Sequence, residues 1–181
     1  MSQQQGIIKG DTLQRLGSLG FIIGAVILIV ANVLLQRPGD PGNTQEVLTT
    51  WGNKAGLVAL VGFLIAVGNW AIMIGTAGIY RSITASGAAW ARLGFYGVIV
   101  GTAIGTISNG LFMPTASIAA DWLAATGADK AAALSVATAL FHVGGVTFTM
   151  YILVEWLAIF FLGIGMARSA VYPKWLGWAG L

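Results

Sequence analysis

Residues 131–166 read AAALSVATALFHVGGVTFTMYILVEWLAIFFLGIGM, and this stretch decides the fold. It holds no Lys, Arg or Asp over 36 residues, and its only acid is Glu155. As one helix it is about 54 Å long, whereas a bilayer core of roughly 30 Å needs about 20 apolar residues. Two crossings would need a turn, which only Gly144-Gly145 offers, with no polar loop. We therefore predict one long helix over 131–167 that crosses the bilayer from about residue 146.

Three more apolar blocks, long enough to cross a bilayer, precede it at 17–35, 56–80 and 94–113. Charged residues make up only 8% of the chain, against about a quarter in soluble domains, so a soluble or disordered chain is excluded. We predict an all-α polytopic membrane helix bundle, with four transmembrane helices in a single integral membrane domain over 1–181. Residues 175–181 resemble the start of a fifth helix, so we expect the natural chain to continue past Leu181.

The basic residues favour one orientation, because cytoplasmic loops are enriched in Lys and Arg. Four crossings place six bases on the side of both termini and three on the other side. The six are Lys9, Arg15, Arg81, Arg92, Arg168 and Lys174; the three are Arg37, Lys54 and Lys130. We predict cytoplasmic termini, in a bacterial inner membrane. Splitting the last block into two crossings would leave four bases inside and five outside, which fits less well.

Few residues are available for chemistry. The chain has no cysteine and a single histidine, which excludes disulfides and thiolate metal sites. No metal cluster, phosphate loop or triad spacing is present. We therefore predict that the protein is not an enzyme.

Glu155 is the most informative polar residue, because a carboxylate inside a membrane helix costs several kcal/mol unless it is paired or protonated. Asn69, near the middle of the second block, is at a similar depth and is the predicted partner. The pair has two interpretations. Glu155 is a protonated structural donor, or it carries protons or a cation.

His142 precedes Gly144-Gly145, where a flat macrocycle could approach the backbone. Its imidazole could ligate haem or a chlorophyll magnesium. The alternative is an interfacial histidine that hydrogen-bonds a carbonyl group or water.

Glycines recur at four-residue spacing on several predicted helices. Such strips let helices approach closely. They are Gly97-x3-Gly101-x3-Gly105, Gly20-x3-Gly24 and Gly163-x3-Ala167. We interpret them as helix-packing faces, and we expect at least one face to contact another subunit.

Four features of the sequence resemble a family of uncharacterised bacterial multipass membrane proteins, classed as a domain of unknown function. They are Leu13-Gln14-Arg15-Leu16-Gly17 at the start of a helix, Tyr80-Arg81 at a helix end, the long penultimate block, and Tyr172-Pro173-Lys174-Trp175-Leu176-Gly177-Trp178. The resemblance implies a bundle with further helices after the last motif. It implies no activity and no site residues.

Three functions are open at this point. The first is a non-catalytic subunit of a larger membrane complex, respiratory or photosynthetic, that packs by its glycine faces and binds pigment or quinone loosely. The second is a small proton- or cation-coupled transporter or channel that uses Glu155 and Asn69. The third is a haem- or chlorophyll-binding electron-transfer subunit that uses His142. The partners expected are the bilayer, other membrane subunits or further copies of the chain, and no nucleic acid.

The orientation can be tested by introducing single cysteines at Gln3 and Asn43. A membrane-impermeant thiol reagent applied to intact cells should label the Asn43→Cys variant but not the Gln3→Cys variant, because one crossing separates the two positions. Labelling of both positions from the same side would contradict the four-crossing topology.

Overall fold

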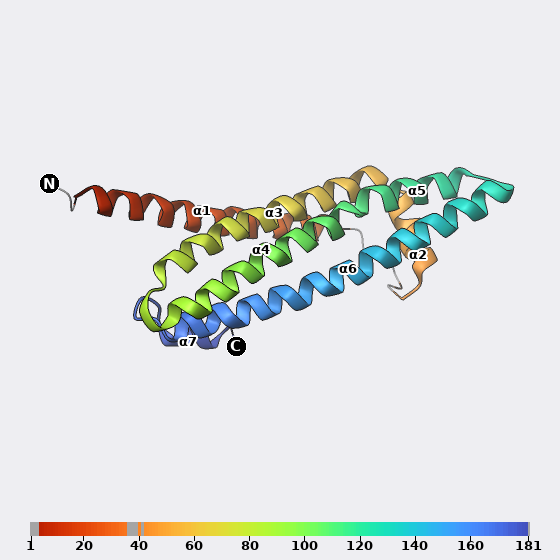
Figure 1. Cartoon of the computed structure of the whole chain (residues 1–181). Helices are drawn as coiled ribbons and strands as arrows, with labels where there is room; N and C mark the ends of the chain where they lie inside the picture. Colours follow the sequence, from red (N-terminus) through yellow and green to blue (C-terminus); the bar gives the residue numbers. More distant parts are fainter. Residues whose placement is uncertain (1–3, 36–39, 41, 181) are drawn as a thin grey trace.

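The computed structural model describes residues 4–35, 40 and 42–180 of the chain. Within these residues it has helices and no strands, which confirms the predicted all-α fold. The long helices run side by side as an elongated bundle (Figure 1). The elements are α1 (Gln4–Leu34), α2 (Thr44–Gly52), α3 (Ala55–Ser82), the 3-10 helix η1 (Ala85–Gly87), α4 (Ala88–Gly110), α5 (Phe112–Ala124), α6 (Gly127–Ala167) and α7 (Lys174–Trp178).

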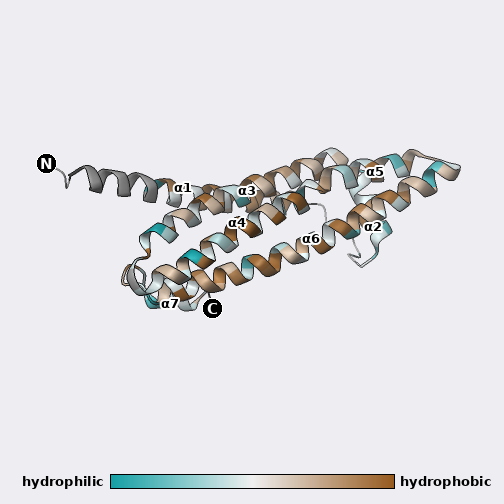
Figure 2. Ribbon diagram, in the orientation of Figure 1, coloured by the Kyte–Doolittle hydropathy of each residue, from teal (hydrophilic) through white to brown (hydrophobic). Residues whose placement is uncertain are grey.

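Four stretches of the described chain are long and apolar enough to cross a membrane: 15–34, 55–82, 88–124 and 127–167. Apolar residues run along these helices (Figure 2). Large side chains on them face outward, with Val33 78% and Trp156 67% exposed. Water would penalise such a surface, whereas hydrocarbon solvates it. The chain is therefore an integral membrane protein.

The long block is one continuous helix, α6, as predicted. It begins at Gly127, so the helix is longer than the apolar block. In the same way α1 begins at Gln4 rather than near residue 17. Hydropathy identifies the part of a helix that suits hydrocarbon, but polar residues before it can remain helical in water.

The start of α1 and the segment of α7 lie at the same end of the bundle (Figure 1).

The third predicted helix, 94–113, is wrong at both ends. In the structure α4 starts at Ala88 and ends at Gly110, and α5 follows at once from Phe112. Pro114 lies in the first turn of α5. Proline is tolerated there because the first turn has no intrahelical acceptor for its missing N–H.

At the far end of the bundle, α2, α5 and the first turns of α6 pack into a small cap. Its buried centre contains Leu48, Ala119 and Ala137, one from each helix. Small residues allow close contact: a Cβ on Gly52 would lie 2.8 Å from the carbonyl carbon of Ala119. One side of the first part of α6 therefore packs against α5 and α2, whereas residues 127–132 are exposed.

The glycine strips lie between helices of the same chain. A Cβ on Gly97 would lie 2.8 Å from the Ala158 Cβ of α6, and one on Gly24 would lie 2.8 Å from the Gly68 carbonyl oxygen of α3. Gly163 lies against the backbone of α7. The short helix α7 occupies part of the predicted 175–181 segment and packs against the end of α6. Each quoted strip thus faces a helix of this chain, and none is left free for another subunit.

We predict that Gly94→Ala destabilises the fold. The added Cβ would lie 2.8 Å from the Ala158 carbonyl oxygen and the Leu162 amide nitrogen, so α4 and α6 must separate. Overpacking of this kind costs about 1–3 kcal/mol. The melting temperature in detergent should fall.

Gly110→Ala, on the same helix, is the matched control, because a Cβ there meets nothing within 4 Å. It should melt like the parent or slightly higher. Equal melting of the Gly94→Ala variant and the parent would show that α4 does not contact α6 closely.

Candidate ligand-binding cavity

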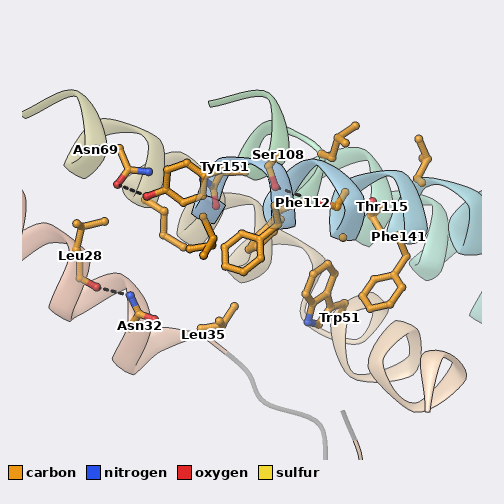
Figure 3. Close-up of a pocket in the computed structure, with 18 residues that line it drawn as sticks. Leu28, Asn32, Leu35, Trp51, Asn69, Ser108, Phe112, Thr115, Phe141 and Tyr151 are labelled. Atoms are coloured by element: carbon orange, nitrogen blue, oxygen red, sulfur yellow. Dashed lines mark hydrogen bonds between the residues drawn. The ribbon is translucent and has the colours of Figure 1, made fainter. Parts of the chain in front are cut away.

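A cavity of about 410 Å³ lies where α1, α3, α4, α5 and α6 meet beside α2. This volume is within the range of small-molecule sites, roughly 300–1,000 Å³. Its walls are mostly apolar, including Leu28, Trp51, Ile65, Phe112, Phe141 and Phe148. The polar side chains among them are Asn32, Asn69, Ser108, Asn109, Thr115 and Tyr151. Figure 3 shows these helices arranged around the cavity.

One end of the cavity is aromatic. The ring of Trp51, on α2, lies 4.9 Å from Phe112 of α5 and 5.8 Å from Phe141 of α6, measured between ring centroids. These tilted and edge-on arrangements are the favoured ones for aromatic pairs. The cap helices thus bring three rings from distant parts of the sequence to one end of the cavity.

Asn69 lies at the other end and is the unusual group of the site. Its side chain is only 6% exposed. The Tyr151 hydroxyl donates a hydrogen bond to its Oδ1 at 3.4 Å, as Figure 3 shows, whereas its Nδ2 has no partner. A buried donor without an acceptor costs about 1–3 kcal/mol. Buried polar groups are nearly always satisfied, so this amide is a candidate binding group.

Three other polar side chains of the lining differ from Asn69 in this respect. Asn109 donates to the Gly105 carbonyl at 2.6 Å, and Asn32 donates to the Leu28 carbonyl at 2.8 Å. The Ser108 hydroxyl donates to the Gly144 carbonyl at 3.2 Å, which joins α4 to α6. Backbone carbonyl groups accept hydrogen bonds from these three donors, whereas no protein group accepts one from the Asn69 amide nitrogen.

Glu155 is not paired with Asn69, which corrects the predicted pair. It lies against α4 instead: its Oε1 is 2.6 Å from the position of a Cβ on Gly101, beside the Thr102 side chain. Tyr151, one turn earlier on α6, takes the position beside Asn69. Residues four apart share a helix face, so the predicted depth was close but the contacting residue was missed.

Tyr151 could have been found from the sequence by its spacing. It lies four residues before Glu155 and carries a hydroxyl, so the same reasoning that assigned a polar face to Glu155 applies to it. Gly105 makes room for its ring, because a Cβ on Gly105 would lie 2.8 Å from Tyr151 Cδ2. Gly101 and Gly105 thus lie under Glu155 and Tyr151.

His142 is not brought to the cavity. It is exposed, its ring packs edge-on to Phe141 at 5.9 Å, and it is not among the lining residues. Gly144 and Gly145, the glycines beside it in sequence, do line the cavity. Within the described residues, no three acidic or histidine side chains gather closely enough to hold a metal ion.

Comparison with curated proteins and with solved structures gives no match. The sequence does match a family profile, described as a domain of unknown function (DUF4386), over residues 16–181. That span includes every residue of the cavity and nearly all of the bundle. The predicted resemblance to an uncharacterised family of membrane proteins is thereby confirmed, and the chain belongs to the DUF4386 family.

Proposed function

We propose that the protein is a non-catalytic membrane protein that binds one small lipid-soluble molecule in the cavity between α1, α3, α4 and α6. The observation that carries the proposal is the buried Asn69 amide nitrogen, which lines this cavity and has no protein partner. An apolar cavity with a few placed polar groups is the usual form of a small-molecule site. A ligand with a suitable acceptor would remove the cost of the unpaired amide.

The lining residues favour binding over catalysis. Apart from the Tyr151 phenol, those that are described include amide and hydroxyl groups but no carboxylate, lysine, arginine or histidine. General acid–base chemistry near neutral pH usually relies on such titratable side chains. The polar groups present are suited to orienting a ligand.

Membership in a larger respiratory or photosynthetic complex is compatible with this binding role but has less support. It was inferred from glycine faces left over for other subunits, and the quoted strips lie against helices of the same chain. The outward faces of α1 and α6 carry large apolar side chains, such as Ile29 and Leu153, which suit lipid equally well.

Transport of protons or cations is the second candidate, because Glu155 lies within α6 between the cavity and α7. Its carboxyl group lies over Gly101 and beside Thr102, contacts that also suit a structural side chain. A transport site shared by Glu155 and Asn69 has no support, because the residue that hydrogen-bonds Asn69 is Tyr151.

We predict that Glu155→Gln leaves folding and ligand binding nearly unchanged. Glutamine keeps the shape and can still lie beside the Thr102 side chain. Melting in detergent and pH-gradient-driven uptake in proteoliposomes are the measurements. A pH-dependent transport signal that the variant abolishes would favour the transporter instead.

Binding itself can be tested by filling the cavity. Gly145 lines it and a Cβ there meets nothing within 4 Å, so we expect Gly145→Phe to fold and its ring to occupy part of the cavity. In nanodiscs, the parent should bind a radiolabelled neutral C10 amphiphile saturably, at about one per chain, and the variant should lose most of this binding.

The matched control is Gly110→Phe, because Gly110 is equally open but does not line the cavity. This variant should bind like the parent. The same non-saturable uptake by the parent, both variants and empty nanodiscs would contradict the proposed function.

A further inference from the structure

We infer that the ligand is an uncharged molecule whose carbonyl-type oxygen accepts a hydrogen bond from Asn69 Nδ2, and whose apolar body extends to the aromatic end of the cavity. This inference rests on the proposed function and specifies its substrate class. The hydrogen-bonding capacity, the charge and the length of the site support it.

What Asn69 lacks is an acceptor for the N–H groups of its Nδ2. An amide nitrogen carries two N–H groups and accepts no hydrogen bond. The Oδ1 of the same Asn69 side chain already accepts a hydrogen bond from the Tyr151 hydroxyl. A ligand that lacks an acceptor would leave Nδ2 unpaired. A saturated acyl chain can fill the volume but cannot satisfy this group.

The cavity also selects against charge. None of the described lining residues is ionisable except Tyr151. An anion would have no cationic partner there. A cation would exchange its water for an apolar lining with no carboxylate among its described residues, and burying an unpaired charge is costly.

The length of the site gives the approximate size of the ligand. Phe141 and Tyr151 both line the cavity and are ten residues apart on α6, a rise of about 15 Å. Asn69 and Tyr151 lie at one end of this span, and Trp51 and Phe141 at the other (Figure 3). Two sources supply a carbonyl on an apolar body of this size: a quinone ring with a tail, and an ester of a fatty acid.

The experiment compares three neutral C10 probes in nanodiscs: 2-decyl-1,4-benzoquinone, methyl decanoate and decylbenzene. Affinities are expressed relative to each probe's concentration in the bilayer, so that partitioning cancels. The parent should bind at least one of the carbonyl probes about fivefold more tightly than decylbenzene, the effect of one neutral hydrogen bond of about 1 kcal/mol. The tighter of the two carbonyl probes identifies the source.

Asn69→Leu should remove this preference while decylbenzene still binds. Asn32→Leu is the matched control, because Asn32 also lines the cavity but its amide already donates to Leu28; it should keep the preference. Should Asn69→Leu fail to fold, the comparison of the three probes in the parent decides alone.

The outcomes separate the two claims. Saturable binding of all three probes with equal affinity in the parent would overturn the carbonyl inference and leave the binding function standing. A preference that survives Asn69→Leu would overturn the assignment to Asn69. Absence of saturable binding for every probe would overturn both claims.

Discussion

The close contact between α4 and α6 is the constraint on which the rest of the structure depends. Gly94 and Gly97 bring the α4 backbone against Ala158 and Leu162, and Gly101 receives the Glu155 side chain. Without side chains between them, the two backbones lie near enough for many small van der Waals contacts. Packing of this kind matters more in a bilayer than in water, because lipid tails leave little hydrophobic drive between helices.

The cavity lies beside this contact, toward α5. Tyr151 packs on Gly105, and the Ser108 hydroxyl still joins α4 to the Gly144 carbonyl of α6. Phe148 on α6 and Phe112 at the start of α5 line the cavity at this level. The change from α4 to α5 at Gly110 and Leu111 falls at the same level. The cavity therefore lies at the level where α4 gives way to α5.

The fold could be predicted largely from the sequence, because hydropathy and length determine how many helices suit a bilayer. The four apolar blocks and the unbroken helix through Gly144-Gly145 are examples. Helix ends were predicted less well: hydropathy marks the crossing, whereas α1 begins in polar sequence at Gln4. The third predicted helix ended at residue 113, three residues too late, because hydropathy does not mark the change from α4 to α5, where Pro114 lies in the first turn of a new helix.

The candidate site was predicted only in part. Asn69 was selected because an amide in an apolar block needs a partner, but its partner is Tyr151 rather than Glu155. Depth along a helix can be counted from the sequence, whereas the direction of a side chain depends on how the helices are rotated. The aromatic end could not be predicted at all, because Trp51, Phe112 and Phe141 meet only through the packing of α2 on α5 and α6.

The central claim is that the Asn69 amide binds an acceptor that the protein does not provide. An experimental structure of the protein purified with its native lipids tests this most directly. The account predicts elongated density in the cavity, from the rings of Trp51 and Phe141 to an atom about 2.7–3.2 Å from Asn69 Nδ2. A cavity closed by its own side chains, or an Asn69 Nδ2 that donates to a protein carbonyl, would contradict it.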